Sequence, residues 1–561
     1  MVHSGELVTG KVGARRAAAA VEGARRRVWA LDRRAVLVLV ALALVGLGLR
    51  ARGLGAVGFA EDETNKLEAV RAYGRGDLTQ NAEHPMLMKA LIYVSVRAAA
   101  AWNARGPAGD TLQTLDISDE AALRLPNALL GALTVFPLCL LTVALFDRRT
   151  GLLAAAFWAC GVNAVTYNRV GKEDTLLVFF LLFAFYFYLR AKQTTGFEPQ
   201  RKHRFYAWSA VSFGLMLASK YFPHYFGLNM LYHHLVRVRR PAPGEPPGRT
   251  PRFFYLLIAA AFLAANPALF SAQTWTYLSA YSGEQLLTHH GYLMGDVLYR
   301  NNPSSTPFGT PVYFYALYLA IKTPLPVLAA LLVGLTVCAR RWREPGPAFL
   351  LLMFVLWIVP YSLFGAKWLR YTLSLMPFVY MLAAVGVAAL LGWGARAWPG
   401  RAAWVVPLRA LVVLLFIGWP AWVAYAAGPH YALYTNALGA GRAGYYFPHD
   451  EFYDDGLREA LRYVCEHAPP GATVVQETPG VARYYLARYG RADLQARALS
   501  DPRFDVTTAP RPAFYVLQRG RTYFENREKM AQVRAAYPRV YEGFVESFGA
   551  TASAVEVYAA Q

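Results

Sequence analysis

The chain has 561 residues, of which 56% are hydrophobic, 14% aromatic and only 17% charged. Soluble domains carry about 25% charged residues, so this composition excludes a disordered or purely soluble protein. The formal net charge is +21, and nucleic-acid binding would require these basic residues to gather on one surface. Four cysteines, three in apolar runs and one far downstream, give no disulfide pattern and leave the redox compartment open: Cys139, Cys160, Cys338 and Cys465.

Long apolar runs predict an α-helical integral membrane protein with about eleven spans. A bilayer is crossed by roughly 20 apolar residues, or fewer where flanking Arg and Lys side chains reach the interface. The candidate spans centre on residues 35–49, 125–146, 150–168, 175–189, 205–219, 221–236, 253–272, 318–338, 348–366, 371–395 and 410–427. The first run could be a signal peptide. It follows a long arginine-rich tail and lacks a small-x-small cleavage site, so we interpret it as a retained anchor.

Basic residues predict the orientation of these spans. The loops at one side of the predicted membrane domain are rich in Arg and Lys: 1–34, 148–149, 190–204, 237–252, 340–343 and 396–409. The positive-inside rule places them all in the cytoplasm. This topology accounts for most of the basic excess, so we expect no nucleic-acid partner. An odd number of spans places the C-terminus outside the cell membrane.

The predicted topology divides the chain into a basic cytoplasmic tail (1–34), a multi-span membrane domain (35–427) and an extracytoplasmic C-terminal domain (428–561). The membrane domain has two large extracytoplasmic loops, 50–120 and 273–317. Within the first, segment 82–101 is apolar but contains Lys89 and Arg97. Counting it as a span would invert every later loop against the charge rule, so we predict an interfacial helix.

The C-terminal segment 428–561 alternates helix-like and strand-like pieces, which predicts a small α/β domain. Helical patterns cover 453–467, 481–489 and 527–537, and β-rich runs cover 473–476 and 513–517. No Gly-rich phosphate loop and no metal-spaced Cys/His set occurs in this segment, so nothing local names its chemistry. No convincing internal repeat is visible, which weakens a transporter built from inverted halves.

Charged residues gather at the outer ends of the predicted spans, where they are costly and therefore candidates for function. They are Glu61, Asp62, Glu63, Glu83, His84, Arg169, Lys172, Glu173, Asp174, Lys220, Lys322, Lys367 and Arg370. Arg and Lys side chains beside carboxylates on one face suggest an anionic ligand held by the cations, next to a carboxylate that acts as a catalytic base. Simpler interpretations stay open: the acids could cap helices, residues 83–85 could form a polar turn, and isolated lysines could be membrane anchors.

A divalent metal (Mg²⁺, Mn²⁺ or Zn²⁺) also stays open. Its weak candidate ligands are Glu83, His84 and His290. His289 and His290 are adjacent and point in different directions from most backbones, and a metal site normally needs three or more ligands.

Together, these residues resemble the GT-C membrane glycosyltransferases, specifically the family 39 group with the protein O-mannosyltransferases and the aminoarabinose lipid A transferases. The resemblance runs along most of the membrane domain. Its motifs, in chain order, are Asp62-Glu63-Thr64, Glu83-His84-Pro85, Arg124-Leu125-Pro126-Asn127, Arg169-Val170-Gly171-Lys172-Glu173-Asp174, Ser219-Lys220-Tyr221, His290-Gly291, Lys322-Thr323-Pro324-Leu325-Pro326 and Lys367-Trp368-Leu369-Arg370-Tyr371.

The resemblance implies transfer of a sugar from a polyprenyl-phosphate donor to a protein, glycolipid or polysaccharide acceptor on the extracytoplasmic face. It implies that Asp62 is the base or orients the acceptor, and that Glu83 and Asp174 line the same cavity. Lys220, with Tyr221 beside it, and Lys322, Lys367 and Arg370 match positions near the lipid phosphate. The sequence departs from its relatives at Met86, where many have a second proline, and at His84, which replaces a lysine of some. Contact of residue 84 with phosphate or metal is therefore in doubt.

The chemistry of the donor agrees with this set of residues. A sugar phosphate leaves as a stable anion, so the enzyme needs no strong general acid, unlike a glycosidase. It needs one base for the acceptor proton and several cations for the departing phosphate. Attack opposite the phosphate would invert the anomeric centre. Two other hypotheses stay open: a lipid-linked-sugar transporter or flippase without transferase activity, and a membrane-anchored binding module whose tail recognises a cell-wall or protein partner.

Overall fold

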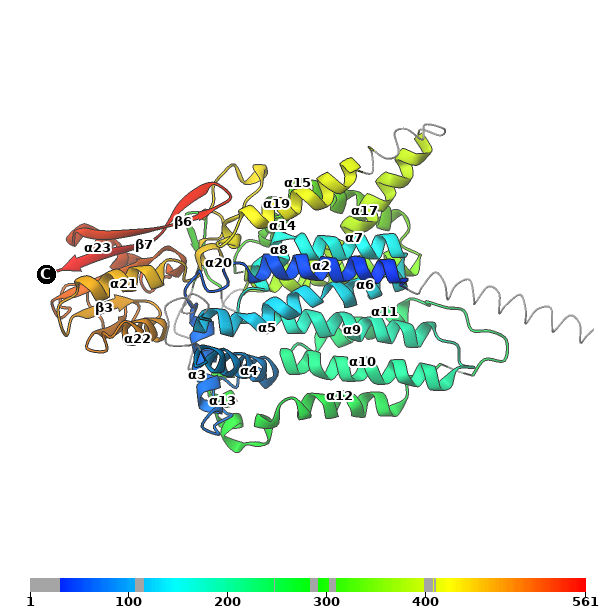
Figure 1. The fold of residues 1–561 in the computed structure, drawn as a ribbon, viewed down its shortest axis with the longest axis horizontal. Coiled ribbons are helices and arrows are strands. Elements are labelled where there is room, and N and C mark those ends of the chain that lie inside the picture. The colour runs from blue at the N-terminus through cyan, green and yellow to red at the C-terminus, as the bar shows by residue number, and fades with distance from the viewer. Residues whose placement is uncertain are drawn as a thin grey trace, which may run out of the picture.

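The computed structural model describes residues 31–105, 116–246, 248–282, 291–301, 309–397, 407 and 410–561. It has a body of long helices at one end and a mixed sheet with its own helices at the other (Figure 1). The candidate ligand His290 lies outside the described residues.

The helical body follows the predicted spans. Its helices are α2 (Arg33–Ala51), α5 (Asp119–Leu133), α6 (Val135–Leu145), α7 (Arg148–Cys160), α8 (Val162–Tyr167), α9 (Asp174–Gln193), α10 (Pro199–Ser219), α11 (His224–Leu235), α12 (Arg252–Ala264), α14 (Phe314–Lys322), α15 (Leu325–Arg340), α16 (Pro345–Leu363), α17 (Met376–Ala397) and α19 (Trp419–Ala426), with short helical turns η2 (Pro267–Phe270), η3 (Leu369–Ser374) and η4 (Leu414–Gly418). Each predicted span contains helix. The mostly helical membrane architecture is confirmed, and the count of eleven stays a prediction.

Five helices are long and apolar enough to cross a bilayer: Arg33–Ala51, Asp119–Leu145, Asp174–Gln193, Pro345–Leu363 and Met376–Gly394. Three shorter apolar helices, Arg252–Ala264, Leu325–Arg340 and Ala410–Ala426, accompany them. The chain is therefore a multi-pass membrane protein.

One predicted span, 318–338, is wrong as a single helix. The structure ends α14 at Lys322 and begins α15 at Leu325, with Thr323 in extended conformation between them. Proline disfavours helical conformation in the residue before it, so Pro324 separates the two helices. As a result Lys322 lies at the end of a helix, where its side chain can reach neighbouring segments.

Close packing of the helices depends on small residues. A Cβ atom at Gly334 of α15 would lie 1.9 Å from the backbone oxygen of Leu382, and one at Gly386 of α17 would lie 2.0 Å from that of Ala330. The backbones of α15 and α17 thus approach as small residues allow between membrane helices. This contact fixes the helix that follows the predicted Lys367–Arg370 site.

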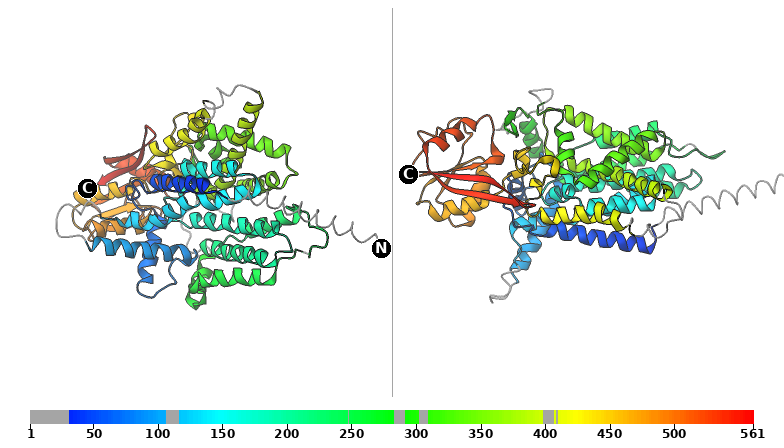
Figure 2. Two further views of the ribbon diagram at one scale, coloured as in Figure 1. Left: turned by 45° about the vertical axis from the view of Figure 1, so that its right-hand side comes forward. Right: turned by 90° about the horizontal axis from the view of Figure 1, so that it is seen from above.

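Smaller elements lie at the end of the body that faces the sheet. They are α3 (Glu61–Tyr73), α4 (Met86–Asn103), α13 (Ala272–Ser282), β1 (Tyr292–Met294), β2 (Val297–Tyr299), η5 (Tyr431–Leu433), η6 (Ala437–Gly439) and α20 (Pro448–Phe452). In the view from above, α4 runs crosswise to the long helices (Figure 2). Segment 82–101 is therefore mostly helical, and its place in the interface stays a prediction.

The C-terminal segment forms a five-stranded sheet of order β4-β3-β5-β7-β6. Its elements are α21 (Leu457–His467), β3 (Thr473–Gln476), α22 (Pro479–Arg488), β4 (Gln495–Ala498), β5 (Ala513–Gln518), η7 (Arg519–Arg521), α23 (Arg527–Ala536), β6 (Arg539–Ser547) and β7 (Ala550–Ala560). Strand β3 is parallel to β4 and β5, whereas β7 is antiparallel to β5 and β6. The five predicted pieces coincide with α21, β3, α22, β5 and α23. Strands β4, β6 and β7 were not predicted.

The sheet domain is packed onto α3 through a shared apolar core. Phe59 and Leu67 from the first loop and α3 belong to the same buried cluster as Leu457 of α21 and Val481 and Tyr485 of α22. The hydroxyl of Tyr485 accepts the backbone N–H of Phe59 at 2.7 Å. The C-terminal domain thus bears directly on the helix that carries the Asp62 motif.

Candidate active site

Helix α3 begins with three consecutive acids, Glu61, Asp62 and Glu63, and each makes different contacts. Glu63 acts as the helix cap, since its Oε2 accepts the N–H of Ala60 at 3.1 Å. The N–H of Glu61 donates instead to the carboxylate of Asp454, 2.8 Å away. The capping interpretation therefore holds for Glu63, while the side chain of Asp62 makes other contacts.

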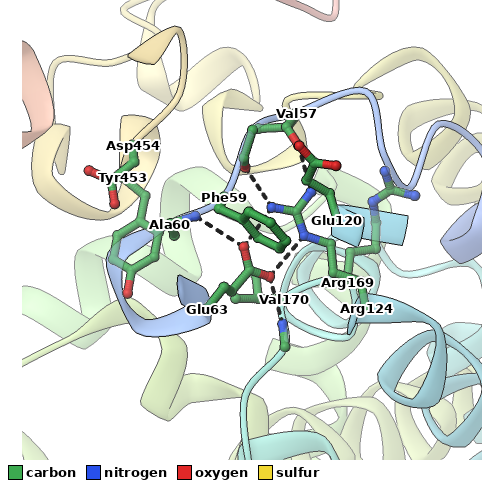
Figure 3. A network of polar contacts seen from close by, with 12 residues as sticks. Val57, Phe59, Ala60, Glu63, Glu120, Arg124, Arg169, Val170, Tyr453 and Asp454 are labelled. Carbon is green, nitrogen blue, oxygen red and sulfur yellow. Dashed lines mark hydrogen bonds and ion pairs between the residues drawn. The ribbon is translucent and has the colours of Figure 1, made fainter. Parts of the chain in front are cut away.

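Glu63 is fully buried and its two oxygens are saturated (Figure 3). Arg124 donates to both of them, at 2.8 and 2.6 Å, and the N–H of Gly171 donates to Oε1 at 2.9 Å. The same guanidinium also donates to three carbonyl oxygens of residues 54–58. This pair ties α3, α5 and the 169–174 motif together, which leaves Glu63 no free oxygen for substrate.

Asp62 makes the contacts expected of a working carboxylate. Its Oδ2 forms an ion pair with Lys172 and accepts the hydroxyl of Tyr453. Burial alone would raise the pKa of Asp62, but the charges of Lys172, Arg370 and Lys66 hold it well below its usual value. Asp62 is therefore an anion at neutral pH, ready to accept a proton.

Lys172 and Arg370 are the two basic groups whose charges most lower the pKa of Asp62. Burial lowers the pKa of Lys172 to about 8, against the opposing effect of Asp62. Burial would also lower the pKa of Arg370, but Asp62 and Tyr453 raise it above its usual value. Arg370 stands over the rings of Trp368 and Tyr371, 5.0 and 5.7 Å from their centres.

A second group of ionised side chains lies beside the first. Glu173, which is buried, forms an ion pair of 3.0 Å with Lys66 and lies 3.8 Å from Nδ1 of His84. Burial lowers the pKa of His84 to about 3, so its imidazole is neutral. Glu83 accepts a hydrogen bond from the side-chain amide of Asn81, and its Oε2 is buried with no hydrogen-bond partner among the described residues.

Asp174 and Lys220 form a separate pair of 2.7 Å. The ammonium of Lys220 also lies 4.9 Å from the ring centre of Tyr371, next to Arg370. Tyr221 instead packs edge-on against Phe262. Of the predicted 219–221 motif, Lys220 therefore contacts both Asp174 and the ring of Tyr371.

Three predicted phosphate-binding residues are engaged elsewhere. Arg169 donates to the carbonyl oxygens of Arg50, Arg52 and Gly53, which places it in a structural role at the end of α2. Lys367 donates to the carbonyl oxygens of Thr310 and Phe364 at 2.7 and 2.8 Å. Lys322 forms a buried ion pair with Glu451. None of these contacts involves Asp62, although Arg169 also lines the cavity described next.

The acidic segment, residues 450–455, is the part of the site that sequence reasoning missed. Together with Lys172, Arg370 and His430 it lines a cavity of about 120 Å³. Two of the lining residues, Lys172 and Tyr453, contact Asp62. His430 pairs with Asp455 at 2.6 Å. The signal was present as the run His-Asp-Glu-Phe-Tyr-Asp-Asp at 449–455, in which four acidic and three aromatic side chains follow one another after the last predicted span.

Within the described residues, no group of three or more His, Cys, Asp and Glu side chains is placed to hold a metal ion. Glu83 and His84 are described, and His290 is not.

The chain is similar to one protein family and to solved membrane transferase structures. The family described as dolichyl-phosphate-mannose-protein mannosyltransferase matches residues 113–271, which run from α5 to α12. No curated protein matches the chain in sequence. ArnT from Cupriavidus metallidurans, in a crystal structure bound to undecaprenyl phosphate, is 13% identical with a TM-score of 0.50, over 93% of this chain and 97% of that chain.

A second structure shares the architecture. The oligosaccharyltransferase of Archaeoglobus fulgidus, tethered to an acceptor peptide containing the NVT sequon, is 12% identical with a TM-score of 0.50, over 94% of this chain and 74% of that chain. The chain has the GT-C fold. The shared fold and the family match agree with the resemblance stated from the sequence motifs.

Proposed function

We propose that this GT-C protein transfers a glycosyl group from a polyprenyl-phosphate-linked sugar to an acceptor hydroxyl or amine, on a protein or glycolipid at the extracytoplasmic face. The observation that carries the proposal is the environment of Asp62, an anionic carboxylate whose partners Lys172 and Tyr453 line a cavity together with Arg370. The undecaprenyl phosphate bound to the similar ArnT structure supports a lipid-phosphate donor. The acceptor peptide tethered in the similar oligosaccharyltransferase structure supports a peptide acceptor.

In the proposed inverting transfer each group has a part. The acceptor oxygen or nitrogen attacks the anomeric carbon while the bond from that carbon to the phosphate oxygen breaks. Asp62 takes the acceptor proton, which becomes acidic as the new bond forms, so a carboxylate of low pKa suffices. Polyprenyl phosphate leaves as an anion, and the fixed positive charges of Arg370 and Lys220 stabilise it.

Three further predicted residues, Glu63, Glu173 and Asp174, support this centre. Glu63 holds α3 through Arg124, and Glu173 neutralises Lys66 beneath Asp62. Asp174 positions Lys220 through their 2.7 Å contact. No step of the proposal uses a divalent cation.

The proposal is tested with purified full-length protein in liposomes. A panel of labelled polyprenyl-phosphate-linked sugars, including mannose and aminoarabinose, is supplied with serine- and threonine-containing peptides and with glycolipids, and the products are identified by mass spectrometry. The expected result is a glycosylated acceptor with inverted anomeric configuration, together with free polyprenyl phosphate. Movement of labelled lipid between leaflets without any such product would instead identify a flippase.

A further inference from the structure

The acidic segment joins the C-terminal domain to the membrane body at several points. Asp450 accepts the hydroxyl of Tyr292 and the backbone N–H of Leu369, the latter at 3.0 Å. Glu451 forms the buried pair with Lys322. These contacts reach β1, η3 and α14, so the segment is held by three separate parts of the body.

Asp454 extends the same connection to the sheet. Arg521 donates to both of its carboxylate oxygens, at 2.8 and 2.5 Å, and Gln518 donates to one of them at 2.8 Å. Asp454 also accepts the N–H of Glu61 at the start of α3. One buried carboxylate thus links the end of β5 to the first residue of the helix that carries Asp62.

Tyr453 lies in the chain between Glu451, which pairs with Lys322, and Asp454, which pairs with Arg521. It has an unusual backbone conformation. Its φ is 48° and its ψ is −109°, a region that bulky L-residues rarely adopt. A Cβ atom at Gly520 would lie 2.7 Å from the backbone oxygen of Tyr453, so a glycine is needed opposite it. Such strain persists where the surroundings over-determine it, and it is often found at functional sites.

The contacts of Asp62 are divided unequally between its two oxygens. Lys172 and the hydroxyl of Tyr453 both bind Oδ2. Among the contacts made by the described residues, none involves Oδ1, and the side chain is 28% exposed. The carboxylate is therefore held by one oxygen and presents the other.

We propose that Tyr453 is a positioning residue through which the C-terminal domain aims Oδ1 of Asp62 at the acceptor. This inference rests on the proposed function. The hydroxyl of Tyr453 and the ammonium of Lys172 fix Oδ2, and the acceptor proton passes to Oδ1 as the glycosyl bond forms. The C-terminal domain then takes part in the reaction through the strained residue 453.

The test compares Tyr453→Phe with the wild-type protein in the liposome assay, using the donor and acceptor that give the highest wild-type turnover. Loss of one hydrogen bond to a carboxylate predicts a fall in kcat of about tenfold or more, with KM for the donor unchanged within about twofold. The acid limb of the pH profile moves to higher pH, because a hydrogen bond to the charged form lowers a pKa and its removal raises it. Lys172, Arg370 and Lys66 still face Asp62 in the variant.

Tyr445→Phe is the matched control. Its hydroxyl also donates to an aspartate, Asp296, at 3.1 Å, but on the exposed surface. This variant is expected to keep the wild-type kcat and pH profile. The thermal midpoint of both variants is measured in parallel. If Tyr453→Phe does not fold, Asp454→Asn, which loosens the anchor and keeps the hydroxyl, is expected to lower kcat without changing KM.

An unchanged kcat and acid limb in Tyr453→Phe, or in Asp454→Asn where that variant replaces it, would overturn the inference. If Asp62→Asn at the same time abolished transfer, the proposed function would stand without it. Transfer that survives in Asp62→Asn would instead remove the proposed base, and the role of Tyr453 with it.

Discussion

The buried pair of Glu63 and Arg124 predicts a large and specific loss of stability when either partner is changed. In Glu63→Gln the Arg124 guanidinium keeps its charge in a buried position and loses its carboxylate partner. Breaking a buried ion pair from one side costs about 3–5 kcal/mol. An unfolding entropy of roughly 2.1 cal/mol/K per residue then predicts a fall in the thermal midpoint of about 3–4 °C for a chain of this length.

The assay is the thermal loss of monodisperse protein in detergent, at one fixed heating rate because irreversible unfolding makes the midpoint depend on it. Arg124→Met is measured alongside Glu63→Gln. The double variant is expected to lose less stability than the two single variants added together, since neither charge is then left alone. Glu466→Gln is the control, because its pair with Arg462 is exposed and is worth less than about 1 kcal/mol.

Midpoints within about 1 °C of wild type for both Glu63→Gln and Arg124→Met would refute this reasoning. Strictly additive losses in the double variant would also contradict it, because they would show that the two side chains act independently.

Two further predictions concern individual lysines. Lys172→Met removes the cation that most lowers the pKa of Asp62. The carboxylate is then protonated at higher pH, so the acid limb of the kcat profile moves to higher pH, whereas Lys172→Arg keeps the wild-type profile. An unmoved acid limb in Lys172→Met would argue against Asp62 as the base. Lys322→Met leaves Glu451 buried without its cation. The variant is expected to lose about 3–5 kcal/mol of folding free energy, measured as a lower thermal midpoint. A wild-type midpoint would show that this pair does not hold the acidic segment in place.

Local signals in the sequence predicted the helical body well. Apolar length alone located the helices, because a bilayer demands long uninterrupted runs. The break at Pro324 was readable too, since proline disfavours helix in the residue before it, but the apolar count through 318–338 outweighed it. The strands at 539–547 and 550–560 were missed because their side-chain pattern is partly polar on both faces.

The candidate site was predicted only in part. Asp62 pairs with Lys172, and Asp174 pairs with Lys220. All four residues belong to motifs that the sequence had singled out. The different roles of Asp62 and Glu63 could not be read from adjacent letters, since they depend on Arg124 and Tyr453, which are distant in sequence. An acidic run such as 450–455 also looks like a solvated turn until its partners are known.

The most direct test of the account is the rate of transfer in Asp62→Asn under single-turnover conditions, measured as labelled acceptor and as released polyprenyl phosphate. Asparagine keeps the size of the side chain and cannot take the proton, so a loss of at least about a hundredfold is expected. Glu68→Gln, which changes an exposed carboxylate on the same helix, should retain the wild-type rate. A wild-type rate in Asp62→Asn would contradict the central claim that this carboxylate is the base.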